Sequence, residues 1–130
     1  MRDGVLAEER TLLVNRLSLL PLAGALILTA SVALSANEPP APISVVMKSI
    51  SYDPKSVEVP VGGSVVWTNK AFTNHTATSD DGQTFDTAEI KPNESSSPVK
   101  FDKEGEFPYH CKIHGKTMSG TVVVKPAGAN

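Results

Sequence analysis

The sequence predicts an all-β sandwich of seven or eight strands arranged in two sheets. From Ile43 onward, short segments rich in β-branched residues alternate with turn signals about every ten residues. No segment there shows a convincing amphipathic-helix pattern. A chain of 130 residues has room for one such domain.

Residues 1–36 precede this domain and are predicted to form an export segment. An apolar run from Leu19 to Leu28 follows Arg16 and lies in a charge-free stretch. The pattern is typical of a signal peptide, and Ser35 is suitable as the residue before the cleavage site. Pro21 and the polar residues late in the run favour cleavage, whereas an uncleaved membrane anchor is the alternative because about twenty uncharged residues can span a bilayer.

Residues 37–42 form a proline-rich linker that cannot pair in a sheet and is expected to act as an extended tether. The folded domain is predicted over residues 43–126. Its first strand is expected over Ile43–Tyr52, where β-branched residues are frequent, and the dipeptide Asp53-Pro54 is expected to end that strand as a turn.

The remaining elements follow from alternation and turn residues. Polar and apolar residues alternate in Ser56–Val59, Gly62-Gly63 turns the chain, and Ser64–Asn69 forms a strand around Trp67. Such alternation is typical of antiparallel sheets with one face on the core, which Trp67 and the valines are expected to dominate. Further extended segments are expected at Phe85–Ile90, Pro98–Phe101, Glu106–Cys111 and Gly120–Val124.

Charge and cysteine content exclude several functions. The net charge is −2 and the basic residues do not cluster, so neither a nucleic-acid surface nor a polybasic membrane patch is indicated. The single cysteine, Cys111, cannot form an intrachain disulfide. A free thiol on an exported chain is open to oxidation, which favours a thiolate that is held by a metal.

Cys111 begins a short loop that carries three metal-binding side chains. His114 follows three residues later and Met118 four residues after that, between two extended segments. Thiolate, imidazole and thioether together suit copper, which favours two imidazoles and one thiolate in a trigonal set with a weak axial thioether. One imidazole must therefore come from elsewhere in the chain.

Of the three histidines, His75 is the best candidate for that imidazole. His110 adjoins Cys111 on a predicted strand, so their side chains point to opposite faces and they are poor co-ligands for one ion. The predicted metal ligands are therefore His75, Cys111, His114 and Met118.

Several motifs resemble the small blue copper proteins, the cupredoxins, and within them the amicyanin and plastocyanin branch. They are the spacing C-x-x-H-x-x-x-M before a valine strand, the segment Tyr109-His110-Cys111, and Val65–Asn69 ahead of a histidine; the resemblance covers residues 43 to 125. It implies a Greek-key sandwich, one type 1 copper ion and the transfer of single electrons. It also implies transient redox protein partners that dock near His114.

Two positions depart from the pattern of that family. Thr76 follows the first histidine, where the family generally has asparagine, and its hydroxyl is expected to take over part of the asparagine's role in joining the two ligand loops. Ile113 stands where the family favours proline, and its backbone N–H is a candidate donor to the thiolate, which would shift the reduction potential.

Three alternatives compete with electron transfer through copper. An enzyme with a cysteine nucleophile is disfavoured because the domain is small and no third orienting residue is apparent. Zinc is disfavoured because Met118 is a poor zinc ligand. Copper delivery or storage uses the same ligands and remains the alternative. The sequence thus predicts a monomeric, non-enzymatic copper protein of the periplasm or the outer face of the cytoplasmic membrane.

Overall fold

The computed structural model describes residues 38–128, which form β strands and connecting loops. The strands are β1 (Ile43–Lys48), β2 (Ser51–Asp53), β3 (Ser56–Pro60), β4 (Ser64–Asn69), β5 (Thr78–Ser79), β6 (Val99–Lys100), β7 (Gly105–Cys111) and β8 (Gly115–Lys125). Within residues 38–128 there is no helix, in agreement with the predicted all-β class.

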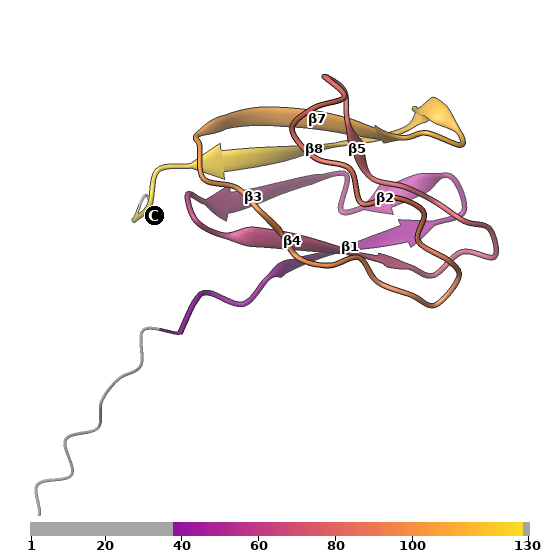
Figure 1. Ribbon diagram of the computed structural model, residues 1–130, viewed down its shortest axis with the longest axis horizontal. Coiled ribbons are helices and arrows are strands. Elements are labelled where there is room, and N and C mark those ends of the chain that lie inside the picture. The colour runs from indigo at the N-terminus through magenta and orange to yellow at the C-terminus, as the bar shows by residue number, and fades with distance from the viewer. Residues whose placement is uncertain (1–37, 129–130) are drawn as a thin grey trace, which may run out of the picture. The chain divides into compact units, whose positions relative to one another are not determined.

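These strands form two four-stranded sheets that face each other (Figure 1). One sheet has the order β2-β1-β4-β6 and the other the order β3-β8-β7-β5. The prediction of a sandwich of seven or eight strands in two sheets is thereby confirmed.

Both sheets are mixed, so the expectation of antiparallel sheets is wrong. β1 runs parallel to β4, with Val45 opposite Trp67, and β3 runs parallel to β8, with Val57 opposite Val122. Alternation of buried and exposed residues reports that a sheet has one face on the core. The alternation does not depend on the direction of the neighbouring strand. The two parallel pairs therefore could not be predicted from it.

Two predicted segments also differ in detail. The strand expected over Ile43–Tyr52 is divided by a two-residue turn, after which Lys48 pairs with Ser51. The segment Phe85–Ile90 forms only isolated bridges, through Asp86 and Ile90. In this segment a side chain takes the place of backbone pairing, because Asp86 Oδ1 accepts a hydrogen bond from the backbone N–H of Ala88 at 2.9 Å. The positive φ of Ala88, 60°, also interrupts the extended backbone conformation.

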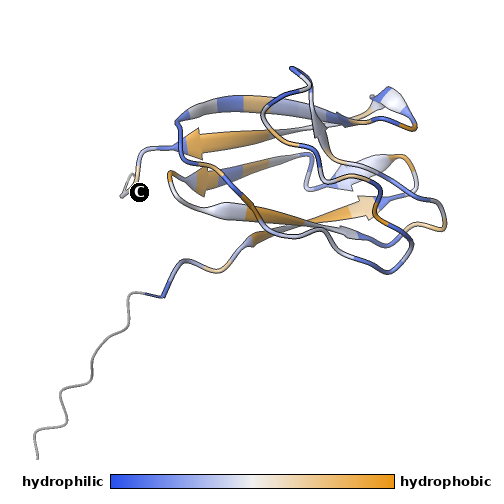
Figure 2. Cartoon of the chain, in the orientation of Figure 1, coloured by the Kyte–Doolittle hydropathy of each residue, from blue (hydrophilic) through white to orange (hydrophobic). Residues whose placement is uncertain are grey.

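The core lies between the two sheets and consists mainly of valines and aromatic residues. Trp67 and Tyr109 are both fully buried, and their rings meet edge to face with centroids 5.4 Å apart. Figure 2 shows that hydrophobic residues concentrate on the strands, whereas the loops are mostly hydrophilic. The expected dominance of Trp67 and the valines in the core is confirmed.

The predicted export segment or anchor, residues 1–36, lies outside the described residues. Of the predicted linker, Glu38–Pro42 is exposed and belongs to no strand. Among residues 38–128 there is no helix of the length and apolar character needed to cross a membrane.

Candidate metal centre

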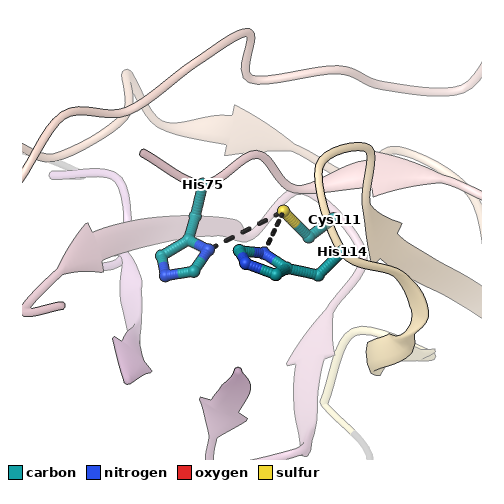
Figure 3. A group of neighbouring side chains, drawn as sticks. All are labelled: His75, Cys111 and His114. Carbon is teal, nitrogen blue, oxygen red and sulfur yellow. Dashed lines mark hydrogen bonds between the residues drawn. The ribbon is translucent and has the colours of Figure 1, made fainter. Parts of the chain in front are cut away.

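Three of the four predicted ligands, His75, Cys111 and His114, lie close together (Figure 3). His75 comes from the loop between β4 and β5, Cys111 ends β7, and His114 lies in the turn that joins β7 to β8. The sulfur of Cys111 and one ring nitrogen of each histidine all lie within 4.8 Å of one another. Folding therefore brings together donors that are far apart in the sequence.

The distances suit a shared metal ion. Cys111 Sγ lies 3.8 Å from Nδ1 of His75 and 3.6 Å from Nδ1 of His114. Bonds of about 2.0 Å to nitrogen and about 2.3 Å to sulfur, as zinc forms, would put these donor pairs about 3.7 Å apart at a trigonal angle. The same nitrogen of each ring faces the sulfur, as Figure 3 shows. Both sulfur–nitrogen distances therefore fit donors that share one metal ion.

His75 is held by the backbone on both sides. Its N–H donates to the carbonyl of Ile90 at 3.2 Å, and its carbonyl accepts from the N–H of Ile90 at 2.8 Å. Asn69, at the end of β4, donates from Nδ2 to the carbonyls of Thr73 and Ile90, each at 2.8 Å, and accepts from the N–H of Ala71 at 2.8 Å. Asn69 thus supports the His75 loop, a role that the sequence reasoning missed.

Cys111 and His114 are placed by the β7–β8 hairpin. The register shifts between His110 and Cys111, so that Cys111 pairs with Gly115. Gly115 has a φ of 65°, a conformation that glycine adopts without strain. Thr117 Oγ1 donates to the carbonyl of His114 at 2.6 Å. These features fold the chain tightly enough to return His114 to the sulfur of Cys111.

Burial favours the protonation state that a metal needs. His75 is fully buried, and this burial lowers its pKa below the ordinary value, with a further lowering from the adjacent His114. A neutral imidazole is the form that binds metal ions. Nε2 of His75 is buried without a hydrogen-bond partner among the described residues. Nδ1 is the ring nitrogen that faces the sulfur of Cys111.

The thiol sulfur accepts a hydrogen bond from the backbone N–H of Thr76, at 3.4 Å. In the described part of the chain this N–H takes the place of the donor expected from Ile113. The side chain of Thr76 accepts from the N–H of Lys112 at 2.9 Å, so it joins the two ligand loops as expected from the sequence.

The other two candidate residues lie as follows. Met118 is fully buried on β8 and belongs to the same core cluster as Cys111. His110 lies outside the three-residue cluster and bonds through Nδ1 to Asp80 Oδ1 at 2.6 Å. The alternation along β7 therefore separates His110 from Cys111, as predicted.

Residues 38–128 thus form a β-sandwich that gathers two imidazoles and one thiolate, which defines a metal-binding domain. Residues 19–124 match the family model described as a cupredoxin-like domain. This match covers more than half of the chain, and the chain therefore belongs to the cupredoxin-like family.

Individual proteins extend this assignment. The chain is 32% identical over 114 residues to a chloroplastic plastocyanin from Tetradesmus obliquus, covering 79% of this chain and 78% of that protein. An oxidized amicyanin variant is 25% identical with a TM-score of 0.58, covering 65% of this chain and 82% of the other. A copper-containing nitrite reductase from Thermus scotoductus is 32% identical with a TM-score of 0.60 over 66% of this chain. The present chain spans only 23% of that reductase.

Family and geometry agree on the metal. The soft thiolate and two imidazoles form the equatorial set that copper favours. The predicted copper cofactor is thereby confirmed.

Proposed function

We propose that this chain is an exported blue copper protein that passes single electrons between protein partners. The observation that carries the proposal is the approach of two Nδ1 atoms to one buried cysteine sulfur at 3.6 and 3.8 Å. Both are distances that donors to a common metal ion would have.

The four residues have distinct roles in this proposal. His75, Cys111 and His114 would hold the copper ion, and Met118 would be a further, weaker donor that tunes its reduction potential. Copper bound at this site would alternate between Cu(I) and Cu(II). The buried side chains of His75, Cys111 and Met118 are held by the packed sandwich, so the donors move little between the two states. Small rearrangement favours fast electron transfer.

Redox partners are proposed to dock near His114. This residue is only partly buried, unlike His75, and lies next to Ile113, which is 48% exposed. Phe72, in the loop that precedes His75, is fully exposed. An exposed apolar side chain next to a partly exposed ligand suits a small, transient contact. Electrons would then enter or leave through the His114 ring edge.

The cellular location and the oligomeric state of the protein are part of the same proposal. Export rests on the apolar segment Leu19–Leu28 and places the protein in the periplasm or at the outer face of the cytoplasmic membrane. An uncleaved segment would anchor it there. We expect a monomer without a nucleic-acid partner.

Copper delivery or storage is the second candidate, because the same donors bind copper for either purpose. A fully buried thiolate favours redox cycling over rapid exchange of the ion. Nitrite reduction by this chain alone is not proposed, because the chain spans only 23% of the similar reductase and His110 is its only histidine outside the cluster.

The visible spectrum of the purified protein tests the proposal. After copper(II) is added, we expect an intense blue thiolate-to-copper band that disappears on reduction and returns on oxidation. Cys111→Ser should abolish the band, whereas the matched variant His110→Gln should keep it. Binding of copper(I) alone without colour would favour delivery or storage, and binding of neither ion would refute a copper function.

A further inference from the structure

A closed ring of hydrogen bonds lies beside the metal centre and joins both ligand loops. Lys112 N–H donates to Thr76 Oγ1 at 2.9 Å, and Thr76 Oγ1 lies 3.0 Å from Thr78 Oγ1. Thr78 Oγ1 donates to Asp86 Oδ1 at 3.1 Å, and the Lys112 ammonium donates to Asp86 Oδ2, which closes the ring. Thr76 directly follows His75, and Lys112 directly follows Cys111.

The backbone N–H of Lys112 and the carboxylate of Asp86 determine the direction of every hydrogen bond in this ring. A backbone N–H can only donate, so Thr76 Oγ1 accepts from Lys112. Burial raises the pKa of Asp86, but hydrogen bonds from Lys112, Ala88 and Thr78 outweigh it and hold this pKa below its ordinary value. An ionised carboxylate only accepts, so the single hydroxyl proton of Thr78 goes to Asp86. The proton of Thr76 must therefore go to Thr78.

This direction has a consequence for the thiolate. Because the hydroxyl proton of Thr76 is committed to Thr78, that hydroxyl does not donate to the sulfur of Cys111. The backbone N–H of Thr76 does, at 3.4 Å. The ring thus orients Thr76 toward the loop that contains Cys111. The Thr76 side chain accepts a hydrogen bond from Lys112, and its backbone N–H donates to the sulfur of Cys111.

Burial makes the ring hard to replace with water. Thr76 is 2% exposed and Thr78 is 4% exposed, so a hydroxyl that loses its partner there stays unpaired. Asp86 lies closer to the surface, with a side chain that is 38% exposed. The ring therefore runs from the surface to the atoms that contact the sulfur.

We propose that Thr78 and Asp86 are positioning residues of the metal centre, which hold Thr76 and thereby fix the spacing between His75 and Cys111. Neither residue shares a hydrogen bond with His75, Cys111 or His114 in the part of the chain that the structure describes. The inference rests on the proposed function for the identity of the metal. The ring itself consists of protein atoms alone.

Thr78→Val tests the proposal because it keeps the shape of the side chain and removes the hydroxyl. In the metal-free variant, we expect the amide of Lys112 to exchange with solvent about tenfold faster, because its acceptor is no longer oriented. Copper affinity should fall about tenfold, as for other partners that orient metal ligands. Thr78→Ser should restore both values.

A second pair of variants separates the hydrogen bond from the ion pair. Asp86→Ala removes the acceptor at an exposed site, so folding is expected to survive, and it should reproduce the effect of Thr78→Val. Asp86→Asn keeps an acceptor for Thr78 and should retain most of the wild-type amide protection. Matched controls are Thr68→Val, which breaks the hydroxyl pair with Ser95, and Asp102→Ala, which breaks the ion pair with Lys100. Both controls should leave the Lys112 amide unchanged.

The outcomes are distinct from those of the proposed function. If Thr78→Val and Asp86→Ala leave Lys112 exchange and copper affinity within about twofold of wild type, the positioning role is wrong. If all variants, including wild type, fail to bind copper, the proposed function is wrong, yet Lys112 exchange in the metal-free protein still decides whether the ring holds the two loops together.

Discussion

Gly120 on β8 has no room for a side chain. A Cβ there would lie 2.6 Å from both Cζ and the hydroxyl oxygen of Tyr109 and 2.9 Å from the carbonyl oxygen of Lys55. Tyr109 is fully buried, and burial raises the pKa of its hydroxyl to about 12, so the ring stays neutral in the core. Neither the ring nor the backbone at Lys55 can move aside easily.

Gly120→Ala should therefore reduce the free energy of unfolding by about 1–3 kcal/mol, the usual cost of an overpacked core. Urea denaturation of the metal-free protein measures this change. Ser119→Ala is the neighbouring control and should change it by less than about 0.5 kcal/mol. Equal stability of Gly120→Ala and wild type would contradict the tight contact with Tyr109.

Asn69 is a second single residue on which the site depends. It is fully buried and makes three side-chain hydrogen bonds to the backbone around the His75 loop. Asn69→Ala should lower the free energy of unfolding by about 1–3 kcal/mol, because buried backbone groups lose their partners. Asn74→Ala, which removes an exposed bond to Glu89, is the control and should have little effect. Thermal unfolding followed by circular dichroism compares the two variants.

Some strands of the fold could be predicted from the sequence pattern and others could not. Burial alternates along β3, as do the polar and apolar residues of Ser56–Val59 that predicted this strand. Burial also alternates along β4, which was predicted around Trp67 after the Gly62-Gly63 turn. The two-residue strand β5 left no such signal, because it is too short to show a period, whereas β6 lies within the extended segment expected at Pro98–Phe101. Phe85–Ile90 resembles a strand in composition, but the Asp86 side chain competes for its backbone.

The turn around Asp81 is stabilised by one carboxylate. Ser79 Oγ donates to Asp81 Oδ1 at 2.7 Å, and the backbone N–H groups of Gln83 and Thr84 donate to the same oxygen at 2.8 and 2.9 Å. These bonds, the one from Ser79 first, hold the pKa of Asp81 well below its ordinary value. The carboxylate binds protons less readily in the folded protein than in the unfolded chain.

Asp81 should therefore stabilise the fold at neutral pH and lose this effect in acid. The contribution is fully present above the unfolded pKa of about 3.9 and declines as the pH falls toward the lower folded value. Asp81→Asn keeps an acceptor but cannot titrate. The difference in unfolding temperature between wild type and Asp81→Asn should shrink from pH 5 to pH 2.5. A constant difference over this range would contradict the assignment.

At the scale of the whole molecule, the sequence predicted the residues of the metal site better than the residues and strand pairs that hold them in place. The spacing of Cys111 and His114, with the exclusion of His110, was enough to identify the three residues that the structure brings together. Thr78 and Asp86 were not identified, because threonine and aspartate are common in loops and only the fold shows that they form a ring. The direction of strand pairing was also missed.

Metal binding should stabilise the entire domain, because its donors come from separate loops that unfolding takes apart. At copper(I) concentrations about a hundred times the Kd, the free energy of unfolding should rise by about 2.7 kcal/mol. Differential scanning calorimetry without oxygen, before and after addition of a copper chelator, measures the effect. Cys111→Ser should show a much smaller rise. An unfolding temperature that is the same with and without copper would contradict this prediction.

The order of strands in the second sheet also determines when the protein can fold during its synthesis. β3 pairs only with β8, and β5 pairs only with β7, so both must wait for residues 105–125. A nascent chain that has emerged as far as β6 can complete the first sheet but not the second. Folding of the second sheet is therefore expected only after residues 105–125 have left the ribosome. If the protein is exported as proposed, this delay keeps the chain loose enough to be threaded through a translocation channel before it takes up copper.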